Sequence, residues 1–193
     1  TEGKLHIPTI STAKSVGLIR EAKKNKLDVT CSVAIHNLCF SDEVLSEFET
    51  RYKVLPPLRT QNDIDALLEG LKDGTIDMVT SDHNPLNIEL KDKEFDYAIP
   101  GTIGLESAFG ALNSKLPVKS TVKILTKGKD RFSVESMPIN EGNKAILTLF
   151  NPDKKYTFSN ENISSKSNNS IFIGSDLKGK VYGVFNNNIL KLN

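Results

Sequence analysis

Apolar and polar positions alternate along the first part of the chain as expected for strands and helices that follow one another. Runs rich in β-branched residues predict strands, and apolar positions repeating every three or four residues predict helices. The predicted strands cover residues 5–7, which Pro8 ends, 29–35 and 76–81. The predicted helices cover about 13–24 with Ser11 or Thr12 as N-cap, a short stretch from Ser41, 64–71 with Asn62 or Asp63 as cap, and about 105–112. Residues 52–59 contain two prolines and predict an extended loop. This order is typical of a parallel α/β sheet or barrel.

The pattern changes after about Ser133. Short strand-like runs occur at 145–150, 156–158, 171–173 and 181–185, and turns rich in Asn, Ser and Gly separate them. Residues 159–170 are polar and predict a loose loop. We therefore predict two parts, an α/β part over residues 1–132 and a small β part over residues 133–193.

Composition narrows the class of protein. The chain has 193 residues, 38% of them hydrophobic and 25% charged, with a net charge of +1, so neither a nucleic-acid surface nor an acidic-membrane surface is expected. No apolar run approaches the length of a membrane span, and no secretory signal opens the chain. Cys31 and Cys39 form no CxxC pair and predict reduced thiols in a cytoplasmic protein. The chain starts at Thr1 without Met and enters a strand pattern at once, so we expect a boundary there within something longer.

The stretch Thr80–Pro85 carries the most chemical information. Its carboxylate, Asp82, follows a predicted buried strand, and the carboxyl ends of strands form the active-site face of α/β barrels. An Asp at that place can bind a metal and accept a proton from water. By its local pattern alone, Asp82 could equally be a turn former.

Neighbouring motifs add specificity to this stretch. In order along the chain come Tyr52–Thr60 with its two prolines, Gly70–Asp77, Thr80–Pro85, Pro100–Glu106 and Glu141–Pro152. This series resembles the dihydroorotase family, in which K-x-N-P-P-L-R, D-G-T-I-D, T-D-H-A-P-H, P-G-x-x-G-L-E and E-G-x-x-A-D-L-x-x-F-D-P follow one another. Gly179–Val181 also resembles the family's closing G-K-V strand, so the resemblance covers nearly the whole chain.

The resemblance implies a fold and an activity. It implies the C-terminal half of a (β/α)₈ barrel, including its last four strands, followed by part of a β-sandwich. The implied reaction is the reversible cyclisation of N-carbamoyl-aspartate to dihydroorotate in pyrimidine synthesis. The family's zinc ligands on the first strand and in the middle of the barrel would lie upstream of Thr1. Implied partners are therefore this small-molecule substrate, the N-terminal half of the same protein and a second copy in a homodimer.

The resemblance also assigns roles to residues of this chain. Asp82 matches the metal-binding and proton-accepting Asp, and Arg59, Pro100 and Gly101 match positions near the substrate. Arg59 could equally be a surface residue or a structural anchor, and Pro100-Gly101, with Gly104, could simply form a tight loop. His6 and His36 match family histidines, although structural roles are the commoner outcome for such residues. The alternative for His83 is a hydrogen bond to a neighbouring loop.

Several positions depart from the family's pattern. Thr9 stands where the His-x-x-His pair has its metal ligand, and a neutral hydroxyl is a poor zinc ligand. Ser32 replaces an acid, and Leu55 and Leu86 replace an Asn and a His that would contact the substrate. These departures leave three hypotheses open. The first is a working dihydroorotase, and the second is a non-catalytic subunit that stabilises a partner such as aspartate transcarbamoylase. The third, less favoured by the order of the loops, is a hydantoinase- or allantoinase-like enzyme.

Overall fold

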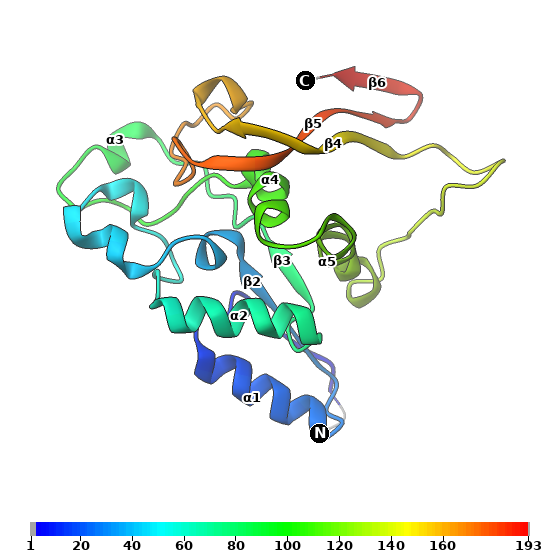
Figure 1. Ribbon diagram of the computed structural model, residues 1–193, viewed down its shortest axis with the longest axis horizontal. Helices are drawn as coiled ribbons and strands as arrows, with labels where there is room; N and C mark the ends of the chain where they lie inside the picture. The colour runs from blue at the N-terminus through cyan, green and yellow to red at the C-terminus, as the bar shows by residue number, and fades with distance from the viewer. Residues whose placement is uncertain (1–2, 193) are drawn as a thin grey trace.

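A computed structural model describes residues 3–192 of the protein (Figure 1). The predicted boundary at Thr1 lies outside the described residues. The strands are β1 (Leu5–Ile7), β2 (Val29–Ala34), β3 (Met78–Thr80), β4 (Leu147–Thr157), β5 (Asp176–Asn186) and β6 (Ile189–Leu192). The α-helices are α1 (Ala13–Lys24), α2 (Gln61–Asp73), α3 (Ile88–Lys91), α4 (Leu105–Lys115) and α5 (Val118–Arg131). Short 3₁₀ helices cover Ile35–Leu38, Asp42–Glu47, Thr50–Tyr52 and Asn160–Asn162.

The first sheet is parallel, in the order β1-β2-β3. Its register pairs His6 with Thr30, and Ser32 with Met78. Since paired residues of neighbouring strands share a face, these four side chains lie on the same side of the sheet. The described residues contain three parallel strands, and an isolated parallel bridge joins His83, beyond β3, to Thr102, so the expectation of four barrel strands stays a prediction.

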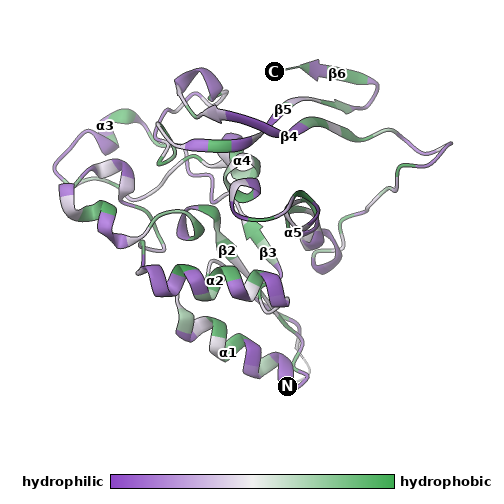
Figure 2. Cartoon of the chain, in the orientation of Figure 1, coloured by the Kyte–Doolittle hydropathy of each residue, from purple (hydrophilic) through white to green (hydrophobic). Residues whose placement is uncertain are grey.

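The other face of this sheet meets the helices. Cys31 and Val33 are fully buried, and Val16 of α1 and Leu67 of α2 belong to the same core. Figure 2 shows β2 and β3 as mainly hydrophobic ribbons, whereas α1 and α2 carry polar residues on their solvent side. Burial of these alternating positions explains why the strand and helix periodicities were predictive.

The second sheet is antiparallel, in the order β4-β5-β6, and α4 packs against β5. Asn113 of α4 donates its amide to the carbonyls of Pro152 (2.8 Å) and Lys178 (2.9 Å). Gly179 has φ +107°, and a Cβ atom there would lie 2.7 Å from the Phe109 ring, so this close approach requires glycine. The helix and the sheet are therefore joined by hydrogen bonds and by packing.

Several sequence predictions need correction. The N-cap of α1 is Thr12, one of the two candidates, but that of α2 is Thr60 rather than Asn62 or Asp63. Residues 171–173 form a buried turn rather than a strand, because their side chains fill the core. The runs 145–150 and 156–158 belong to one irregular strand, β4.

The predicted loose loop at 159–170 is held in place instead. Asn169 is buried, accepts the backbone N–H of Leu86 (3.1 Å) and donates to the carbonyl of Asn84 (3.0 Å). Ser167 also accepts the Leu86 N–H at 3.1 Å. The polar side chains of this loop thus serve to hold the loop that follows β3.

Candidate active site at the carboxyl ends of the parallel strands

The pocket that contains Asp82 measures about 620 Å³ and opens at the carboxyl ends of β1, β2 and β3. Its walls carry residues from all three strands and from the end of α5. They are His6, Pro8, Thr9, Ser32, Met78, Val79, Thr80, Ser81, Asp82 and Phe132. The parallel sheet therefore brings together Asp82, His6, Thr9 and Ser32, which the sequence analysis had singled out separately.

Asp82 sits at the tip of β3 in a left-handed backbone conformation, with φ +46°. Its backbone N–H donates to the Thr80 hydroxyl at 3.1 Å, which fixes the turn. Burial raises the pKa of the Asp82 carboxyl above its ordinary value, and no cationic neighbour opposes this shift. Within residues 3–192 its carboxylate makes neither a hydrogen bond nor an ion pair, so it is free to exchange a proton with a ligand in the pocket.

His6 lies on the same wall but is only partly free. Its Nδ1 is 2.9 Å from the Thr30 hydroxyl, and its ring meets Phe132 edge-on at 5.2 Å between centroids. Burial and the nearby Arg131 lower the pKa of His6, so the ring is neutral at pH 7. Nε2 offers a lone pair to the pocket only when Nδ1–H donates to Thr30.

Thr9 also has a left-handed backbone, with φ +44°, which is strained for a β-branched residue. Its backbone N–H donates to the Ser32 hydroxyl at 3.2 Å. Two of the three strand ends around the pocket, at Thr9 and Asp82, thus share a positive φ and a backbone N–H bound by a neighbouring hydroxyl. Such strain is concentrated at functional sites in proteins.

The residues present do not fit a complete zinc site. Structural and catalytic zinc ions take three or four protein ligands from Cys, His, Asp and Glu. The part of the chain that the structure describes contains no group of three such residues arranged to hold a metal ion. The pocket supplies one imidazole and one carboxylate, and the hydroxyls of Thr9 and Ser32 do not replace the missing ligands.

The other predicted residues lie outside this pocket. Arg59 is half-buried, and its Nε contacts the Ser11 hydroxyl at 3.4 Å. The Gly101 N–H donates to the Lys53 carbonyl at 3.0 Å, and Pro100 has no N–H to offer. A Cβ atom at Gly101 would lie 2.4 Å from the Asn84 amide, so the glycine is needed for close packing of this loop.

His36 and His83 are both held within the fold. His36 is fully buried, and burial lowers its pKa to about 4, although the Pro56 carbonyl partly opposes this. Neither of its ring nitrogens has a hydrogen-bond partner among residues 3–192. Nδ1 of His83 accepts the backbone N–H groups of Gly104 and Leu105, both at 3.3 Å, at the start of α4. His83 thereby ties the strand end beside Asp82 to that helix.

Sequence reasoning missed Thr30 and Phe132. Thr30 could have been found from the parallel register, which places it opposite His6. Phe132 reaches the pocket from a helix that the hydrophobic pattern had not predicted, and no local signal linked it to His6.

Comparison with known proteins agrees with the motifs. No protein-family model matches the chain. It is 42% identical over 188 residues to a dihydroorotase of Endomicrobium trichonymphae, covering 93% of this chain and 44% of that protein. It is 41% identical over 199 residues to a dihydroorotase of Caldicellulosiruptor saccharolyticus, covering 99% of this chain and 46% of that protein.

Solved structures of cyclic amidohydrolases share the α/β fold. A dihydropyrimidinase from Brevibacillus agri superposes with a TM-score of 0.86 at 26% identity, covering 100% of this chain and 45% of that one. The inactive dihydroorotase-like domain of a Chaetomium thermophilum CAD-like multifunctional protein gives a TM-score of 0.68 at 22% identity, covering 97% of this chain and 50% of that one. The chain spans less than half the length of the curated relatives it matches. On sequence similarity to these relatives, the chain belongs to the dihydroorotase family of cyclic amidohydrolases.

Proposed function

We propose that the protein containing this chain is a cytoplasmic dihydroorotase of de novo pyrimidine biosynthesis. Its substrates would be dihydroorotate and N-carbamoyl-aspartate, and Asp82 would be its proton-transfer residue. The observation that carries the proposal is the partly buried carboxylate of Asp82, which has no hydrogen-bond or ion-pair partner among residues 3–192 and lies at the strand ends of a chain 42% identical to a dihydroorotase.

Asp82 can serve both directions of the reaction. In hydrolysis, the carboxylate accepts a proton from water as the water oxygen attacks the ring amide carbonyl carbon. The C–N bond then breaks, and the protonated Asp82 returns its proton to the departing nitrogen. In ring closure the same proton moves in reverse. A raised pKa suits this exchange, because it brings the carboxyl closer to the working pH.

The family's zinc is not assigned to residues of this chain. The pocket holds one imidazole and one carboxylate, so any zinc in the working enzyme would need ligands from outside residues 3–192. Arg59, Pro100 and Gly101 remain proposed substrate residues. Rearrangement of the Ser11 contact would be needed before Arg59 could reach a ligand beside Asp82.

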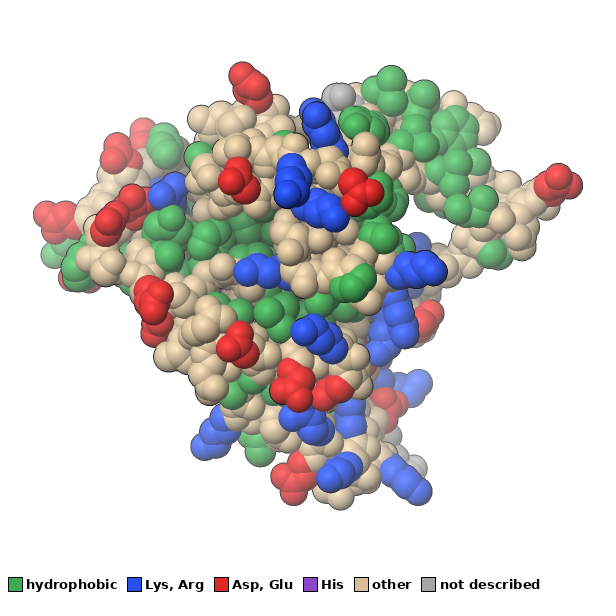
Figure 3. All heavy atoms as spheres, viewed as in Figure 1, with side chains coloured by type: hydrophobic (Ala, Val, Ile, Leu, Met, Phe, Trp, Pro, Cys, Tyr) green, Lys and Arg blue, Asp and Glu red, His purple; other side chains and the backbone are tan. Residues whose placement is uncertain are grey.

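The architecture supports a larger assembly. We propose that residues 1–132 form part of a (β/α)₈ barrel and that 133–193 form part of a β-sandwich. Among the described strands, β1 pairs only with β2, so this edge of the sheet is open. Apolar side chains of the second sheet are exposed, including Val184, Ile189 and Leu192 (45%, 68% and 64%), and Figure 3 shows green side chains gathered there. The N-terminal half of the same protein is the proposed cover, and a second copy in a homodimer is the alternative.

The test is turnover of dihydroorotate, followed in both directions with the protein at its full natural length. Asp82→Asn and Asp82→Ala are compared with Asp96→Ala, which removes an exposed carboxylate from the loop after β3. Loss of turnover in both Asp82 variants, with normal activity in Asp96→Ala, supports the proposal. Equal activity in all variants contradicts the role of Asp82.

Absence of turnover in the unmodified protein, with zinc supplied, contradicts the enzymatic proposal as a whole. That result would favour the non-catalytic alternative, for which the replacement of a ligand by Thr9 is the specific observation. Co-elution with aspartate transcarbamoylase in size-exclusion chromatography would then be the next measurement.

A further inference from the structure

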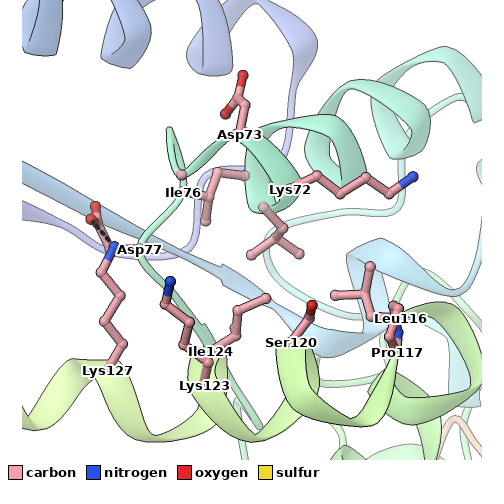
Figure 4. Close-up of a pocket in the computed structure, with 12 residues that line it drawn as sticks. Lys72, Asp73, Ile76, Asp77, Leu116, Pro117, Ser120, Lys123, Ile124 and Lys127 are labelled. Atoms are coloured by element: carbon pink, nitrogen blue, oxygen red, sulfur yellow. Dashed lines mark hydrogen bonds and ion pairs between the residues drawn. The ribbon is translucent and has the colours of Figure 1, made fainter.

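A second pocket lies at the opposite end of β3, between α2 and α5 (Figure 4). Its volume is about 420 Å³, which falls within the range of small-molecule sites in proteins. Ile76 and Asp77, which precede β3, line it, whereas Asp82 follows the same strand at its other end. The two pockets share no lining residue.

The base of this pocket is apolar. Leu71, Ile76, Leu116 and Ile124 all line it, and each is at least nine-tenths buried. Such a surface favours a ligand with an apolar body, because contact with it removes apolar area from water.

Cationic side chains surround this apolar base. Lys72, Lys123 and Lys127 line the pocket together with the Ser120 hydroxyl. Figure 4 shows Lys123 and Ser120 projecting from α5 towards the wall that carries Ile76, while Lys72 extends along α2, away from Lys123. Helix α5 carries five basic residues and one acidic residue, and no acidic residue lies in its first turn. The local field therefore favours a negatively charged group.

The acidic residues of the pocket neutralise Lys127 but leave Lys72 and Lys123 without an ion-pair partner among residues 3–192. Both oxygens of Asp77 are occupied: Oδ2 accepts Lys23 Nζ (2.7 Å) and the Cys31 N–H (3.0 Å), and Oδ1 accepts Lys127 Nζ (3.1 Å). Asp73 pairs with Arg20 at 2.7 Å. In the described part of the chain, neither Lys72 nor Lys123 forms an ion pair. The same saturation of Asp77 argues against a metal cation as the ligand.

We propose that the groove between α2 and α5 binds a small organic anion. Its phosphate or carboxylate group lies against Lys123 and Ser120, and its apolar part covers Ile76, Leu116 and Ile124. The proposal concerns binding alone and does not depend on dihydroorotase activity.

Calorimetric titration of the full-length protein tests this with three probes: phenyl phosphate, benzoate and inorganic phosphate. Saturable binding of phenyl phosphate or benzoate is expected, with inorganic phosphate weaker because it lacks the apolar part. The stronger of the two ring-bearing probes shows whether phosphate or carboxylate is preferred. Binding of inorganic phosphate as tight as that of phenyl phosphate would refute the role of the apolar base.

Variants locate the site. Lys123→Ala should weaken binding roughly tenfold, equivalent to about 1.4 kcal/mol, because it removes a charge that contacts the anion. Lys129→Ala is the matched control, since Lys129 is an exposed lysine of the same helix that does not line the pocket. Unchanged affinity in Lys123→Ala, an equal loss in Lys129→Ala, or no saturable binding of either ring-bearing probe would overturn the proposal.

Discussion

Asp77 connects three elements at the start of β3, and its removal is the sharpest test of how this fold is held. Its side chain is 8% exposed and binds Lys23 of α1, Lys127 of α5 and the backbone N–H of Cys31 in β2. Asp77→Ala leaves the Cys31 N–H unsatisfied and both lysines without their partner. Breaking a buried ion pair costs about 3–5 kcal/mol, and the lower end applies because Lys23 and Lys127 are 26% and 39% exposed and can regain water. We therefore expect a loss of about 3 kcal/mol in the free energy of unfolding.

Thermal unfolding followed by circular dichroism measures this loss. For a cooperative unit of 150–250 residues it corresponds to a fall of roughly 6–12 °C in Tm. The control is Asp153→Ala, which removes an exposed partner of Lys178 and should change stability by less than about 1 kcal/mol.

The pH dependence gives a second readout. Hydrogen bonds and Lys23 hold the pKa of Asp77 below its ordinary value despite the opposing effect of burial. The stabilisation is therefore present above the unfolded pKa, and it is lost as pH falls through the lower folded pKa. The difference between wild type and Asp77→Ala should shrink in acid. A loss no greater than that of Asp153→Ala, or one that does not depend on acid pH, would refute this account.

Four further predictions concern single residues. Burial lowers the pKa of His36 to about 4, so the unfolded chain binds more protons than the folded chain between pH 6.5 and 4. In urea titrations, the free energy of unfolding of the wild type should therefore fall by about 3 kcal/mol relative to that of His36→Leu as the pH is lowered over this range. Burial lowers the pKa of Lys91, which donates to three carbonyls, to about 8. The Tm of the wild type should therefore rise between about pH 8 and 10, because the folded chain no longer holds a buried charge there, and Lys91→Met should lack this rise. A Cβ atom on Gly104 would lie 2.1 Å from the Ser81 carbonyl, so Gly104→Ala should cost about 2 kcal/mol or more by chemical denaturation. Thr9→Asn should raise stability by about 1 kcal/mol in the same assay, because Asn tolerates a left-handed backbone better; an unchanged midpoint would argue against strain at Thr9.

The elements that the sequence predicted best are those whose periodicity arises from burial. Strand β2 buries all of its residues except Thr30, and α1 buries Val16 and Ile19 while Lys14 and Lys24 face water. Local pattern was insufficient for α5, where only Thr121 and Ile124 are buried and the rest is dominated by polar and basic residues. It also failed at residues 171–173, because an apolar run can fill a core from a turn as well as from a strand.

In the candidate site, too, residues within a local motif could be predicted from the sequence, and contacts between distant residues could not. Asp82 was found because the motif around it is local in sequence. The contact between His6 and Phe132 joins residues more than a hundred positions apart in the chain, and no local rule can supply it. The sequence analysis also placed Arg59 and Gly101 near the substrate, whereas in the structure their observed contacts are with Ser11 and Lys53.

Backbone and side chain have separate roles at the strand ends of this protein. The turns at Thr9 and Asp82 are set by N–H groups that bind the Ser32 and Thr80 hydroxyls, so neither turn depends on the side chain that it presents to the pocket. A ligating imidazole can therefore be absent at position 9 while the turn that would present it persists. Since His tolerates a positive φ better than Thr, the backbone at position 9 is at least as compatible with His as with the residue it carries. Among residues 3–192, the absence of an imidazole at position 9 is thus a matter of side-chain identity and not of the backbone that surrounds it.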